Sequence, residues 1–76
     1  MFKRTYKIVI DKNQGDEGFK AFCFVLQAFG EIADIREWEK VYIFRFKATR
    51  KQFNEMIKGL REHDYKPIKV ANYWII

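Results

Sequence analysis

Serine does not occur in this sequence of 76 residues, and cysteine, histidine and proline each occur once. The lack of serine excludes a serine nucleophile, and one cysteine with one histidine excludes a disulfide scaffold and a Cys/His metal cluster. No apolar run approaches the ~20 residues of a membrane span, and the first residues lack the core of a signal peptide. We therefore expect a cytoplasmic protein that is not an enzyme and has no cofactor, bound metal, small-molecule substrate or membrane partner.

The residues that are present indicate a folded and basic module. Hydrophobic residues make up 49% of the chain and aromatic residues 18%, which is far above the level of a disordered segment. Lysine and arginine number 15 against 10 acidic residues, for a net charge of +5. The length allows one hydrophobic core, so we expect a single domain over residues 1–76.

The first half of the chain changes from a strand period to a helix period. Residues 5–10 are rich in β-branched and aromatic side chains and end at a turn-rich stretch, which predicts a strand. Residues 17–29 then repeat apolar side chains at helical spacing, and Gly30 stands where a C-terminal cap belongs. The apolar stripe of this predicted helix consists of Phe19, Phe22, Cys23, Leu26 and Phe29.

Two alternating runs, residues 32–38 and 41–47, predict a hairpin that turns at Glu39 and Lys40. In this register Asp34 faces Arg45, with which it is expected to pair. A slip by one residue would place Asp34 and Arg36 with the aromatic residues of the core face. The expected core face of the hairpin consists of Ala33, Ile35, Tyr42, Phe44 and Phe46.

The second half repeats the helix–strand order. Thr49 and Gln52 have the spacing of a capping box, and the predicted helix ends near Glu62 or His63, before Pro67. Its apolar stripe consists of Phe53, Met56, Ile57 and Leu60. Residues 66–74 predict the last strand, with Ile68 and Val70 on one face and Lys69, Ala71 and Tyr73 on the other.

This order of elements is that of the ferredoxin-like βαββαβ sandwich, an α+β fold. We expect a four-stranded antiparallel sheet in the order 4-1-3-2 with both helices on one face. The other face of the sheet is then open, and it presents Lys7, Val9, Arg36, Trp38, Val41, Ile43, Arg45, Lys47, Lys69 and Tyr73.

Positive charge is concentrated near this open face. Residues 40–51 carry five cations and no acid, so the rest of the chain is neutral in sum. We expect the binding site to consist of Lys7, Arg36, Trp38, Lys40, Ile43, Arg45, Lys47, Arg50 and Lys51. Phe24 lies off the first helical stripe and is a secondary contact, unless the loop over residues 11–16 or a chain end covers it.

The segment from Lys40 to Phe46 resembles the RNP1 signature of RNA-recognition motifs, in which two aromatic residues lie on the open face and stack on bases. The resemblance covers about seven residues, and it would assign Tyr42 and Phe44 to RNA. Turning these two residues outward would push Arg45 and Lys47 into the core, so the hairpin register predicts that they face inward.

These features leave two functions open. The first is a small interaction module, either a homodimer or an inhibitor of the kind that phages and other mobile elements encode. Such an inhibitor would bind a host complex that handles nucleic acid. The alternative is direct binding of nucleic acid, with Trp38 stacking on bases and the basic residues of the open face on phosphates.

Cys23 is expected to pack in the core, and His63 to contact the C-terminal end of the second helix.

Overall fold

The helices and strands begin and end where the side-chain pattern changes along the chain. The computed structural model describes residues 2–76. In order, the elements are β1 (Arg4–Asp11), the short 3-10 helix η1 (Lys12–Gln14), α1 (Gly15–Phe29), β2 (Glu31–Trp38), β3 (Val41–Ala48), α2 (Arg50–Glu62), β4 (Ile68–Val70) and β5 (Tyr73–Ile75). Both helices and the central hairpin therefore lie where the sequence predicts them.

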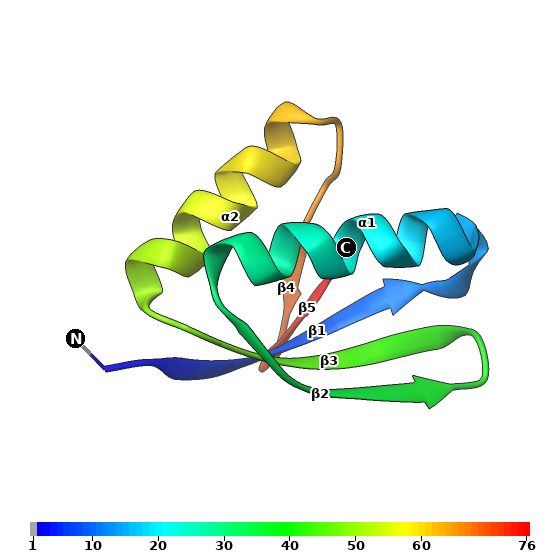
Figure 1. The fold of residues 1–76 in the computed structure, drawn as a ribbon, viewed down its shortest axis with the longest axis horizontal. Helices are drawn as coiled ribbons and strands as arrows, with labels where there is room; N and C mark the ends of the chain where they lie inside the picture. The colour runs from blue at the N-terminus through cyan, green and yellow to red at the C-terminus, as the bar shows by residue number, and fades with distance from the viewer. Residues whose placement is uncertain (1) are drawn as a thin grey trace.

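The strands form one mixed sheet in the order β2-β3-β1-β5-β4. β3 pairs antiparallel with β1 and β2, and β4 pairs antiparallel with β5, while β1 and β5 are parallel. Both helices lie on the same side of this sheet, as Figure 1 shows. The α+β class is confirmed, and one face of the sheet is left without a helix.

The predicted four-stranded antiparallel sheet differs from the five-stranded sheet of the structure. The predicted last strand is divided, because the chain reverses at Ala71, which has a φ of 51°, and at Asn72. β5 then enters between β1 and β4, where Trp74 packs 5.2 Å from the ring of Phe53. Burying this aromatic ring against α2 favours the reversal over a longer straight strand.

The core lies between the sheet and the two helices. Alternate residues of β1 and β3, such as Ile8 and Phe44, are fully buried, and they meet the predicted stripes of both helices. Cys23 and Phe19 are partly buried against this core. The buried hydrophobic residues are Ile8, Ile10, Phe22, Leu26, Phe44, Phe46, Ala48, Phe53, Met56, Ile57 and Leu60.

The hairpin register is confirmed from the turn as far as the pair of Asp34 and Arg45. Beyond it a β-bulge at Ala33 places Ile32, rather than Ala33, opposite Phe46. The expectation that Ala33 faces the core is therefore wrong, because the extra residue shifts the alternation by one. The carboxylate of Asp34 also has a different partner, since Arg36 Nε donates to Asp34 Oδ2 at 3.1 Å.

The two predicted helix ends have different physical causes. The capping box is confirmed, with Gln52 N donating to Thr49 Oγ1 at 3.1 Å and Thr49 N donating to Gln52 Oε1 at 2.9 Å. Gly30 N donates to Leu26 O at 3.0 Å, but its φ of −171° is extended rather than left-handed. A Cβ at Gly30 would lie 2.5 Å from Lys47 O, so close approach of β3, rather than cap geometry, requires glycine here.

Candidate functional site on the open sheet face

Strand pairing arranges the side chains of the open face in rows, because residues that lie opposite each other point to the same side of a sheet. Ile43 lies opposite Val9, Val9 beside Ile75, and Ile75 opposite Ile68. We call these four residues the apolar row. Arg36, which lies opposite Ile43, ends the row on β2, so the row and Arg36 cross all five strands.

The apolar row is well exposed for aliphatic side chains. Ile68 is 58% exposed and Ile75 39%, while Val9 and Ile43 are half-buried. Trp38, 65% exposed, pairs with Val41 one row further along the hairpin and extends the apolar surface to a corner of the sheet. Neither α1 nor α2 covers this surface, which lies on the lower side of the sheet in Figure 1.

A second row beside the first carries most of the charge. Arg45 lies opposite both Asp34 and Lys7, and the ammonium of Lys7 lies 5.8 Å from the centre of the Tyr73 ring. Between the two rows the sheet is hollowed by about 600 Å³. The hollow is lined by Thr5, Lys7, Arg36, Ile43, Arg45 and Asn72.

Carboxylates on the same face offset much of this positive charge. Asp34 is paired with Arg36, and Glu31 lies opposite Lys47. By strand alternation the face carries four cations, Lys7, Arg36, Arg45 and Lys47, against three acids, Asp11, Glu31 and Asp34. The open face is therefore mixed in charge, with a net excess of one cation.

The fold brings only some of the predicted site residues together. Lys7, Arg36, Ile43 and Arg45 line the hollow, and Lys47 lies opposite Thr5 at its edge. Trp38 is at the far end of β2, and Lys40 is in the turn that follows it.

Arg50 and Lys51 lie apart from these residues, in the first turn of α2, on the helix side of the sheet. They share a surface there with Asn54, Glu55 and Lys58. The expectation that Lys69 belongs to the open face is wrong, because Lys69 lies opposite Trp74 and lines a notch with Arg4 and Arg50.

Three apolar residues of the open face were not predicted for it, namely Ile68, Val70 and Ile75. Ile75 reaches the face only because β5 pairs with β1, and its partners on β4 follow it. The signal in the sequence is weak, since Ala71 and Asn72 do not form one of the glycine-containing pairs that mark two-residue hairpin turns.

The aromatic residues that resemble RNP1 point away from the open face. Phe44 is fully buried, and Tyr42 packs against Phe19 of α1 with 4.4 Å between ring centroids. Their inward orientation is as the hairpin register predicts, and it leaves the open face without the base-stacking pair of an RNA-recognition motif.

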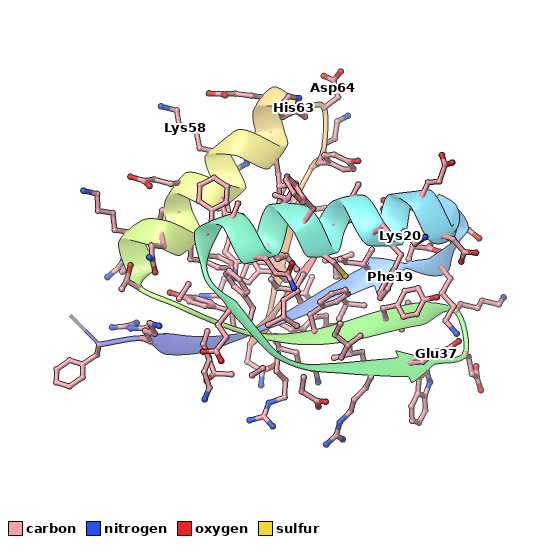
Figure 2. All side chains as sticks on the ribbon, in the orientation of Figure 1. Phe19, Lys20, Glu37, Lys58, His63 and Asp64 are labelled. Carbon is pink, nitrogen blue, oxygen red and sulfur yellow. The ribbon has the colours of Figure 1, made fainter. Side chains whose placement is uncertain are left out.

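An ion pair fixes the corner of the sheet that carries Trp38. Lys12 Nζ donates to Glu37 Oε1 at 2.7 Å and lies 5.3 Å from the centre of the Tyr42 ring. Figure 2 shows Glu37 near the end of β2. Lys12 N also donates to Lys40 O at 2.9 Å, so the β2–β3 turn is tied to the loop after β1.

The reactive side chains lie away from the open face. Cys23 packs on the core side of α1, where burial raises the pKa of its thiol. His63 is exposed at the C-terminal end of α2. Within residues 2–76, His, Cys, Asp and Glu side chains form no group of three that could hold a metal ion. The helices of this part of the chain are also too short or too polar to cross a membrane.

Phe24 lies on the outer surface of α1 and is 77% exposed, so neither the loop after β1 nor a chain end covers it.

In comparisons with known proteins, no family model, no curated protein and no solved structure matches the chain.

Proposed function

We propose that this chain is a non-catalytic module that binds a protein partner through the open face of its sheet. The observation that carries the proposal is the apolar row, which crosses the sheet on the side away from both helices. Contiguous exposed apolar surface of this kind is typical of interaction sites, because leaving it in water is unfavourable by about 25 cal/mol per Å².

The charges around the row favour a protein partner with carboxylates at its rim. Within residues 2–76, Lys7, Arg45 and Lys47 have no carboxylate within ion-pair distance, since the ion pairs there are Lys12–Glu37 and Arg36–Asp34. These three cations are free to meet acidic side chains of a partner. Charges at the rim of an interface guide association and orient the partner, while the apolar centre supplies most of the affinity.

Nucleic acid is the less favoured ligand for this face. Phosphate binding needs an excess of cations, and here Asp34 already neutralises Arg36 and the face as a whole carries a net excess of only one cation. Trp38, the side chain expected to stack on a base, lies in the row of Val41, two residues along β2 from Arg36.

We infer that the architecture is a variant of the ferredoxin-like plan, in which a β4–β5 hairpin takes the place of the last strand. The order from β1 to α2 supports this inference. The hairpin adds a strand to the open face and contributes Ile75 and Ile68, half of the apolar row. With no reaction assigned to it, the module would act by occupying the surface of its partner, as a small inhibitor does.

The test is capture of a protein from source cells, followed by binding to that protein in purified form. Ile43→Glu places a charge at the β3 end of the row, and Ile68→Glu does so at the exposed edge strand, where folding is least affected. Asn54→Glu on the outer surface of α2 is the matched control, since it adds the same charge on the helix side.

We expect wild type and Asn54→Glu to bind the purified partner equally and both row variants to bind at least tenfold more weakly. Circular dichroism melts establish that the variants are folded. Equal binding by all four proteins would contradict the proposal. Tight binding of mixed-sequence single-stranded DNA at low salt, lost in Arg45→Glu, would replace the protein partner by nucleic acid.

A further inference from the structure

A cluster of cations lies on the helix side of the sheet, where the beginnings of β1 and α2 meet β4. Arg4, Arg50 and Lys69 come from these three elements and line one notch of about 270 Å³. Figure 1 shows the first residues of α2 over the first half of β1. The three cations are far apart in the sequence, so only the fold brings them together.

Strand alternation directs Arg4 and Lys69 to the side of the sheet that carries the helices. Arg4 shares its side of β1 with Tyr6 and with the buried Ile8. Lys69 lies opposite Trp74, which in turn lies beside Ile8. Both cations are nevertheless exposed, because they lie past the end of the apolar core. They therefore stand at the rim of the core, facing the beginning of α2.

Packed aromatic rings form the base of the notch. The rings of Tyr6 and Phe53 stack with 3.8 Å between centroids and 9° between planes, and the Trp74 ring lies 5.2 Å from that of Phe53. All three residues line the notch, together with Asn54, which lies one helical turn after Arg50. Tyr6, Trp74 and Asn54 carry uncharged hydrogen-bond donors. The lining thus combines charged and uncharged donors on a packed base.

No carboxylate within residues 2–76 pairs with these cations. Both ion pairs in that range involve acids of β2, at the far edge of the sheet. β4 and β5 carry no acid, and β1 carries only Asp11, at its opposite end. The nearer acid of α2, Glu55, follows Asn54 by one residue and so lies about 100° further round the helix, on a surface that it shares with Lys51. The notch therefore holds three positive charges and no negative one.

The position of Arg50 adds to this electrostatic imbalance. Arg50 and Lys51 lie in the first turn of α2, which carries no acid, at the positive end of the helix dipole. The two cations therefore oppose the dipole, and Arg50 is also repelled by the other cations of the notch. An anion bound in the notch would offset both unfavourable terms.

We propose that this notch binds a small phosphate-containing anion, for which diphosphate is the simplest match. A single phosphate monoester carries about −1.5 to −2 charges at pH 7, so two linked phosphate groups balance three cations more fully than one does. The guanidinium groups of Arg4 and Arg50 can each donate two parallel hydrogen bonds to phosphate oxygens, and Lys69 acts as a point charge.

The size and shape of the notch decide between ligands that carry phosphate. Its volume of about 270 Å³ is below the range of roughly 300–1,000 Å³ for pockets that enclose drug-sized molecules, so it fits an anionic group rather than a whole cofactor. A nucleic-acid strand spreads its charge along its length and is bound by cations in a groove, whereas these three cations converge on one place. The notch lies on the other side of the sheet from the apolar row, so its occupation is independent of the proposed function.

The experiment is titration of the whole chain with sodium diphosphate at low salt, followed by NMR of the tryptophan indole N–H signals. The chain has two tryptophan residues, of which Trp74 lines the notch and Trp38 lies in the row of Val41 on the open face. We expect a saturable shift of the Trp74 signal and none of the Trp38 signal. Arg4→Gln and Lys69→Gln should each weaken binding at least tenfold, because each removes charge-assisted hydrogen bonds.

Arg45→Gln is the matched control, since it removes the same charge from the open face. It should bind diphosphate like wild type, and the three replaced side chains are all exposed, so folding is little affected. An unshifted Trp74 signal at about 10 mM diphosphate would overturn the proposed site. Equal weakening in all three variants would also overturn it, because binding would then follow net charge alone. Tighter binding of mixed-sequence single-stranded DNA at the Trp74 signal would assign the notch to nucleic acid instead. The proposed function fails separately, through unchanged partner binding by Ile43→Glu.

Discussion

Replacing Gly30 by alanine tests the packing of the junction between α1 and β2. The added Cβ would lie 2.5 Å from Lys47 O, 2.6 Å from Phe46 Cζ and 3.0 Å from Ala48 Cβ. The nearest atom belongs to the backbone of β3, and Phe46 and Ala48 are fully buried, so none of the three can move aside without disturbing the core. Overpacking of this kind destabilises a core by about 2–3 kcal/mol.

Gly59→Ala is the matched control for the same substitution. Its Cβ meets nothing within 4 Å, and alanine stabilises a helix interior relative to glycine by about 1 kcal/mol. In a domain of this size 1 kcal/mol shifts the melting temperature by about 4–8 °C. We therefore expect Gly30→Ala to melt roughly 10–20 °C below wild type and Gly59→Ala roughly 4–8 °C above it.

Both variants are measured by circular dichroism melts. A Gly30→Ala protein as stable as wild type would refute the close approach of Gly30 to β3. A Gly59→Ala protein that is less stable than wild type would refute the open space beside α2.

Three further predictions concern the β4–β5 hairpin, the start of α2 and the cysteine. Ala71→Gly should raise the free energy of unfolding by about 1 kcal/mol, because alanine is strained at a φ of 51°; an unchanged melting temperature would argue against the β4–β5 turn. Thr49→Ala should lower the free energy of unfolding by about 1 kcal/mol, because it removes the hydrogen bond from Gln52 N to the Thr49 hydroxyl. Thr49→Ser keeps the hydroxyl and should retain most of that stability in the same melts. Cys23 should react with iodoacetamide more slowly at pH 8 in the folded protein than in urea, because burial raises its pKa and so lowers the thiolate fraction; equal rates would contradict this.

The sequence predicts those parts of the fold in which only one arrangement buries the apolar side chains and leaves the charged side chains in water. In the β2–β3 hairpin, any slip by one residue would bury Arg36 or Arg45. The alternation of apolar and charged residues along the two strands therefore selects the register. The two helices are equally determined, since their apolar stripes match the sheet face that they cover. The bulge at Ala33 is different, because an alanine is tolerated on either face of a strand.

The division of the last strand depends on tertiary contacts. Ala71 gives no turn signal in the sequence. The strand is divided because Trp74 packs against Phe53 of α2, a contact that exists only in the folded chain. For this reason the sequence predicts the β1 and β3 residues of the open face but not Ile75 and Ile68. It also groups Arg50 with Arg45, whereas the structure places them on opposite sides of the sheet, since the chain leaves the sheet at Ala48 to begin α2.

Methyl-detected cross-saturation NMR with the purified partner identifies which face of the molecule the partner contacts. If the open face binds the partner, saturation of the partner should reduce the methyl signals of Val9, Ile43, Ile68 and Ile75, while those of the buried Ile8 and Ile57 should be unaffected. Transfer to Val25 in the groove between the helices, with the apolar row unchanged, would contradict it.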